Sequence, residues 1–142
     1  MSISDPDIQE APVYPVLFEI KQEQHVVQMI NPTKNFTIRF SIYVPYILRE
    51  EIKKHSYYIY VTLSNNEIPI AQKIAPVNPP QDQKVRILQF ASQFDPINLT
   101  NNDSINVQVA ITAKHHDEMG IGEALRVNRF INTYIPLENH YE

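Results

Sequence analysis

The sequence predicts an all-β protein: an antiparallel β-sandwich of seven to eight strands, immunoglobulin-like or jelly-roll-like, with one short helix near residues 45–55. Three observations predict it. Segments in which apolar and polar residues alternate recur along the chain, as half-buried antiparallel strands require. Turn signals containing Pro, Asn or Asp separate these segments at intervals of roughly 8–12 residues. Long helices do not alternate with the strands, and this excludes a parallel α/β sheet.

The clearest strand of the first half covers residues 36–44. Apolar side chains occupy every second position there, and the intervening positions carry Thr37, Arg39, Ser41 and Tyr43. Two further expected strands precede it, the first with a period of two and the second short. They cover residues 13–21 and 25–30, and Asn31-Pro32 turns the chain after the second.

A change of period follows this strand. Pro45 ends it because proline has no N–H for the ladder, but proline suits the first turn of a helix. Leu48 and Ile52 then lie one turn apart, and so do Glu50 and Lys54, which we expect to form an ion pair. A helix of two to three turns is therefore expected here.

The remaining strands are expected at residues 57–63, 68–74, 84–90, 104–114 and 125–135. Pro69 marks the second of these as an edge strand. In the last one, simple alternation would group Arg129 with apolar residues. Since a buried arginine needs a carboxylate partner, we expect a bulge or an edge that lets Arg129 reach water.

The chain of 142 residues and 16.5 kDa suits one domain. Residues 1–12 are acidic and contain proline, so they predict a flexible N-terminal arm, although such a peptide could also lie along a sheet edge as an added strand. Residues 13–137 form the predicted sandwich domain. Residues 138–142 form a predicted flexible C-terminal tail.

Composition argues against most catalytic chemistry, so we expect no enzyme activity and no cofactor. The chain has no cysteine and two glycines, which excludes thiolate sites and leaves little room for a phosphate loop. A net charge of −4 with scattered basic residues argues against binding to nucleic acid.

No membrane contact is expected. The N-terminus lacks a signal peptide, which favours the cytoplasm, while a virion or an extracellular site reached by another route stays open.

The tyrosines are unevenly distributed. Five of the 8 fall in residues 43–60, which is dense enough to form a surface. Alternation places Tyr43 beside Arg39 on the polar side of its strand, and Tyr58 with Tyr60 on one side of theirs. If these two strands pair, Arg39, Tyr43, Tyr58 and Tyr60 form one outer binding surface of the kind found at protein interfaces. The alternative is ordinary cross-strand packing.

The densest polar cluster, His115-His116-Asp117-Glu118, contains side chains that can bind metals. Neighbouring residues of an extended chain point to opposite sides, however, and the other histidines are isolated. We therefore interpret the cluster as the solvated tip of a hairpin and expect no metal site.

Three functions stay open on this basis. The favoured one is a non-catalytic protein–protein interaction or structural assembly module, which uses the tyrosine-rich face and the flexible termini and whose partner includes the chain itself as a homo-oligomer. The second is a carbohydrate- or small-ligand-binding, lectin-like sandwich that uses tyrosines and the Asn-rich residues 98–103. The third is a metal-dependent enzyme centred on His115 and Asp117.

Overall fold

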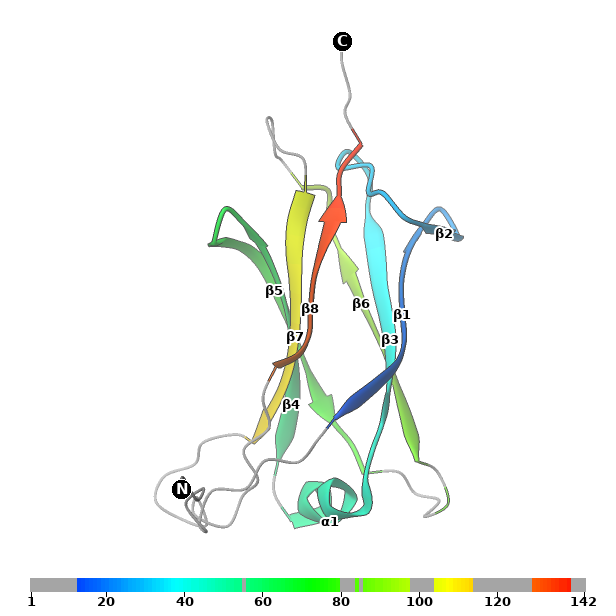
Figure 1. The fold of residues 1–142 in the computed structure, drawn as a ribbon, viewed down its shortest axis with the longest axis vertical. Helices are drawn as coiled ribbons and strands as arrows, with labels where there is room; N and C mark the ends of the chain where they lie inside the picture. The colour runs from blue at the N-terminus through cyan, green and yellow to red at the C-terminus, as the bar shows by residue number, and fades with distance from the viewer. Residues whose placement is uncertain are drawn as a thin grey trace, which may run out of the picture.

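The computed structural model describes residues 13–54, 56–79, 84, 86–97, 104–113 and 129–138. They form two antiparallel four-stranded sheets and a helix, which confirms the predicted all-β sandwich (Figure 1). The first sheet has the order β2-β1-β3-β6, and the second has β5-β4-β7-β8. In chain order the elements are β1 (Tyr14–Gln22), β2 (His25–Val27), β3 (Phe36–Tyr43), α1 (Tyr46–Lys54), β4 (Tyr57–Asn65), β5 (Ile68–Val77), β6 (Ile87–Phe94), β7 (Ser104–Ala113) and β8 (Arg129–Pro136).

The core lies between the sheets and is built mainly by β3, β4 and β7. Each of these strands buries every second side chain, as its alternation predicts. Fully burying one such side chain stabilises the fold by about 1.5–3 kcal/mol. The buried residues of the three strands are Phe36, Ile38, Phe40 and Ile42, then Tyr57, Ile59, Val61 and Leu63, then Ile105, Val107, Val109 and Ile111.

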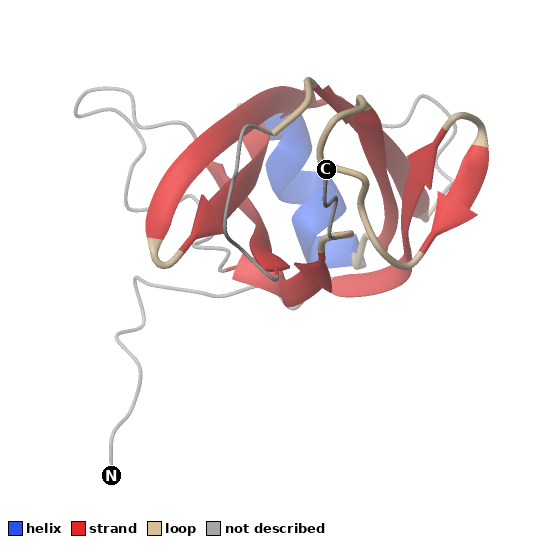
Figure 2. Ribbon diagram, turned by 90° about the horizontal axis from the view of Figure 1, so that it is seen from above, coloured by secondary structure: helices blue, strands red, loops and turns tan. Residues whose placement is uncertain are grey.

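The predicted helix exists as α1, and it carries the chain from the first sheet to the second. Figure 2 shows it spanning one end of the sandwich, between the two layers. Leu48 and Ile52 are buried there. Glu50 pairs with Lys53 at 3.1 Å, not with Lys54 as expected. Because α1 crosses between the layers, β3 and β4 belong to different sheets although they follow each other in the sequence.

Several strand boundaries differ from the sequence expectation. β2 ends at Val27 instead of residue 30, and β5 continues to Val77 instead of ending at residue 74. β6 spans Ile87–Phe94 instead of residues 84–90, because Asp95-Pro96 is the break that ends it. β8 begins at Arg129, and the residues before it that were expected to be strand lie outside the described part of the chain. The predicted arm at 1–12 and residues 139–142 of the predicted tail lie outside it as well.

Backbone contacts at the end of β8 link the two layers of the sandwich. Ile30 forms a parallel bridge with Leu137. The Ile30 N–H donates to the Pro136 carbonyl at 2.9 Å, and the Glu138 N–H donates to the Ile30 carbonyl at 2.8 Å. The buried Gln22 side chain fixes the same loop, since its amide exchanges two 2.9 Å bonds with the backbone of Asn31. The loop after β2 is thereby joined to the end of β8.

Candidate binding surfaces

The four predicted binding residues lie on two surfaces. Arg39 and Tyr43 are on the outer face of the first sheet, and Tyr58 and Tyr60 are on the outer face of the second. The expectation of one shared surface was wrong because β3 and β4 do not pair. Tyr58 and Tyr60 do share a face, as predicted, since they lie opposite Thr112 and Ala110 of β7.

The outer face of the first sheet changes character along its strands. The strand register aligns its residues in rows that cross β1, β3 and β6. The row nearest the helix is apolar, the second is mixed, the third contains an ion pair and the fourth is polar. In that order the rows are Tyr14, Tyr43 and Ile87; Leu17, Ser41 and Gln89; Glu19, Arg39 and Ala91; Lys21, Thr37 and Gln93.

The first row, Tyr14–Tyr43–Ile87, is exposed; we call it the apolar row. Its side chains are 54%, 37% and 43% exposed, respectively, and the neighbouring Leu17 is 41% exposed. The rings of Tyr14 and Tyr43 are in contact, with centroids 6.3 Å apart. Contiguous apolar side chains that face water typically mark an interaction site, unlike single ones.

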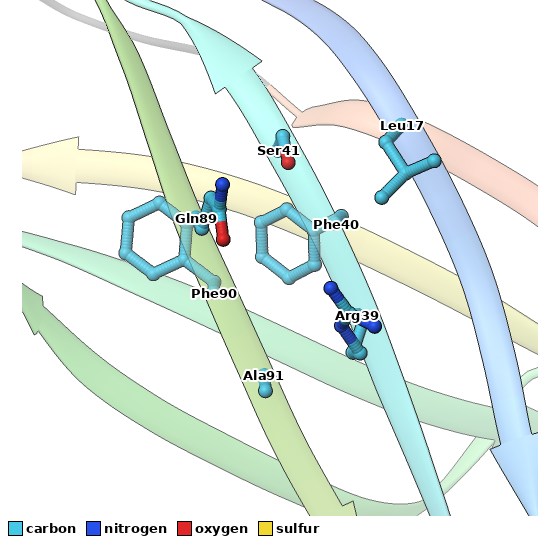
Figure 3. Close-up of a pocket in the computed structure, with 7 residues that line it drawn as sticks. All are labelled: Leu17, Arg39, Phe40, Ser41, Gln89, Phe90 and Ala91. Atoms are coloured by element: carbon cyan, nitrogen blue, oxygen red, sulfur yellow. The ribbon is translucent and has the colours of Figure 1, made fainter. Parts of the chain in front are cut away.

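A shallow hollow of about 250 Å³ lies beside the apolar row. Figure 3 shows the short side chains of Ser41 and Ala91 among the longer ones of Leu17, Arg39 and Gln89. The Arg39 guanidinium is held in place by Glu19, with 2.9 Å between its nitrogen and Oε1. The hollow therefore has an apolar wall, an oriented cation and an amide.

The outer face of the second sheet carries a hydrogen-bonded network over β7 and β8. Arg129 donates to Gln108 Oε1 at 2.9 Å, and Gln108 Nε2 donates to Asn106 Oδ1 at 2.6 Å. Asn106 Nδ2 in turn donates to Asn132 Oδ1 at 2.8 Å. These polar groups bind one another, so this part of the face offers few unsatisfied groups to a partner.

Arg129 lies where sequence reasoning placed it. β8 is an edge strand, its register against β7 shifts at Val109/Ala110, and Arg129 is exposed. The rest of the network was missed. Its signal was the pair Asn106 and Gln108, two amides at alternate positions of one strand, which can bond along a sheet surface.

A second hollow, of about 340 Å³, lies where the end of α1 meets β4 and β5. Tyr58 lines it together with Lys53, Lys54, Pro76 and Pro79. It brings one of the predicted tyrosines beside the only pair of adjacent basic residues in the sequence.

Metal chemistry finds no support in the part of the chain that the structure describes. No group of three or more His, Cys, Asp or Glu side chains there is placed to hold an ion. The cluster at 115–118 and the Asn-rich residues 98–103 lie outside it. Among the described residues, no helix reaches the length and apolarity that crossing a bilayer requires.

The fold and these surfaces define the chain as an all-β sandwich domain. No family model matches its sequence, and no curated protein does. Among solved structures it is similar to the C-terminal domain of Wzt, with a TM-score of 0.50 and 7% sequence identity. The match covers 92% of this chain and 83% of that one. At this identity the likeness shows the fold alone.

Proposed function

We propose that the protein is a non-catalytic module that binds protein, including a second copy of itself, through the outer face of the first sheet. The observation that carries this proposal is the apolar row. Burying its three side chains on association would remove apolar surface from water, which is worth about 25 cal/mol per Å². Tyrosine and arginine are also the residue types that interfaces favour.

The hollow next to the row supports the same surface. A partner side chain that enters between Leu17 and Gln89 meets a guanidinium already oriented by Glu19. Orienting Arg39 before association lowers the conformational entropy that binding would otherwise cost.

Exposed apolar residues of the second sheet are arranged differently. Ile68, Ile70 and Ile74 follow one another along the edge strand β5. Ile74 also forms a row with Tyr60 and Ala110, but Ile74 is its only exposed member. Tyr134, although 70% exposed, lies beside the amide network on β8. The first sheet therefore presents the broader apolar contact.

Matched glutamate substitutions test this assignment. We expect the full chain to self-associate in sedimentation velocity as its concentration rises through the micromolar range. Tyr43→Glu should weaken that association by about tenfold or more, equivalent to about 1.4 kcal/mol. Tyr134→Glu, the same substitution on the other face, should leave it unchanged. A strict monomer at every concentration would contradict self-association, and equal effects of both variants would contradict the choice of face.

A second candidate function rests on the hollow at Tyr58. A tyrosine ring beside lysines and prolines in a concave site is suited to stacking on a sugar or another small polar ligand. Titration with neutral hexoses, followed by tyrosine fluorescence, should show saturable binding that Tyr58→Ala removes without lowering the melting temperature much. A flat titration would rule out hexoses as ligands.

A further inference from the structure

The four edge strands of the two sheets differ in their protection against unwanted pairing. β2 has three residues. β5 contains Pro69 and Pro76, and its Lys73 lies opposite a buried position of β4. β8 begins with Arg129 and ends with Pro136. These are the usual devices that stop one sheet edge from joining another: short strands, prolines and charges.

β6 has none of these devices. Its eight residues, ILQFASQF, contain neither a proline nor a charge. Within the described residues it pairs with β3 on one side only. A long, uncharged edge strand of this kind is a template for the addition of another strand.

The backbone geometry shows which groups of β6 face away from β3. The Val44 N–H donates to the Arg86 carbonyl at 2.7 Å, and the same register continues through Ile42 opposite Leu88 and Phe40 opposite Phe90. Because residues of an antiparallel strand direct N–H and C=O to alternate sides, the even-numbered residues bond to β3. The odd-numbered residues direct theirs to the free edge. They are Ile87, Gln89, Ala91 and Gln93, and all four are exposed.

We propose that β6 pairs antiparallel with β6 of a second copy, about a two-fold axis at Phe90, so that two four-stranded sheets become one continuous sheet. This axis places Ile87 opposite Gln93 of the other copy, and Gln89 opposite Ala91. All four odd-numbered residues then exchange both of their backbone hydrogen bonds. The inference goes beyond the proposed function, because it concerns the backbone groups at the free edge of β6, although the side chains of Ile87, Gln89 and Ala91 also belong to the outer face.

Charge favours a second copy as the occupant. β6 contains no charged residue, so pairing two copies of it places no like charges opposite each other. Arg86 precedes the strand and Asp95 follows it, and both are exposed. Antiparallel pairing about Phe90 puts Arg86 opposite Phe94 of the second copy, next to that copy's Asp95. The basic end of each edge thus meets the acidic end of the other.

The chain's own N-terminal residues fit this edge less well. Residues 1–12 contain Pro6 and Pro12, which cannot donate to a ladder, and three acidic residues that would face an uncharged strand. We therefore assign the edge to a second copy and make occupation by the arm an outcome of the test.

The test uses the full chain with Tyr43→Glu, so that any contact through the apolar row is already weakened. In sedimentation velocity this variant should still dimerise as concentration rises. Adding Gln89→Lys and Ala91→Lys places like charges opposite each other twice and should weaken the dimer by about tenfold or more. Adding Gln89→Lys and Ala91→Glu places opposite charges there and should preserve it. Ile74→Lys on the guarded strand β5 is the matched control and should have no effect.

Amide hydrogen exchange by NMR supplies a second readout that a misfolded variant would not imitate. Raising the concentration should slow exchange at Ile87, Gln89, Ala91 and Gln93, and leave the alternate residues of β6 unchanged. Protection of those four amides at every concentration would overturn the inference in favour of the chain's own arm. A monomeric Tyr43→Glu chain, or equal dimers from both double variants, would also overturn it. In either case the face proposal stands or falls on its own glutamate pair.

Discussion

β3 and β7, an inner strand from each of the two sheets, are alike on the side that faces the core and different on the outer side. Both bury an unbroken series of alternate apolar side chains. Outside, β3 contributes Tyr43 to an exposed apolar row and holds Arg39 in an ion pair with Glu19. β7 instead joins Asn106 and Gln108 in an amide network. The same alternation therefore builds one surface that has binding groups to offer and another whose polar groups already bind one another.

The largest expected effect on stability distinguishes the buried side of β3 from its exposed side. Phe40 stacks on Phe90 with 5.2 Å between ring centroids and contacts Phe130 at 6.1 Å. Phe40→Ala should lower the free energy of unfolding by about 3–5 kcal/mol, because it opens a cavity in the shared core. Tyr43→Ala should change it by about 0.5 kcal/mol, as is usual for a surface substitution. Urea unfolding measures both, and similar losses would mean that Tyr43 is part of the core.

An intermediate effect on stability distinguishes the outer face of the second sheet from that of the first. Gln108→Leu keeps the size of the side chain but removes the acceptor of Arg129 and the donor to Asn106, so it should cost about 1–2 kcal/mol. Arg39→Met removes an exposed ion pair on β3 and should cost about 0.2–1 kcal/mol. The melting temperatures of the two variants show which of them loses more stability. A reversed order would contradict the view that the second face is stabilised by its network.

The smallest expected effect is on how stability depends on pH. A hydrogen bond from Lys34 lowers the pKa of Glu23, which lies in the β1–β2 turn, below its ordinary value of 4.5. A carboxyl group whose pKa is lower in the folded state than in the unfolded state stabilises the fold at pH values above its unfolded-state pKa. That stabilisation is lost as the pH falls through the folded-state pKa. Lys34→Met should therefore remove a small stabilisation at neutral pH and none in strong acid. The amide network does not titrate, so Gln108→Leu should show the same loss at both pH values.

The sequence predicted the elements better than their partners. Alternation in 36–44 and 104–114 identified the inward residues of β3 and β7, and Pro45 marked the start of the helix. Alternation assigns a residue to one side of its own strand, however, and it does not say which strands pair. For this reason Tyr43 and Tyr58 were predicted to share a surface, although α1 separates their strands into different sheets.

The candidate surfaces depend on the same missing information. The absence of proline and charge from β6 can be read in the sequence, but it matters only because β6 is an edge, and strand order comes from pairing between distant residues. The apolar row likewise cannot be recognised without the strand register, which places Tyr14 and Ile87 on either side of Tyr43. Arg129 was predicted correctly because the cost of burying its charge is a local argument.

The order of the strands along the chain has a consequence for synthesis on the ribosome. Every strand of the first sheet precedes residue 95, whereas β7 and β8 are translated after them. The nascent first sheet can therefore emerge before β7 and β8 leave the ribosome, and partly folded chains with exposed apolar surface are prone to aggregate. Leu137, which joins Ile30 across the two layers, emerges only after all the described strands. Until then, newly made chains on neighbouring ribosomes expose both an uncovered apolar layer and an open strand.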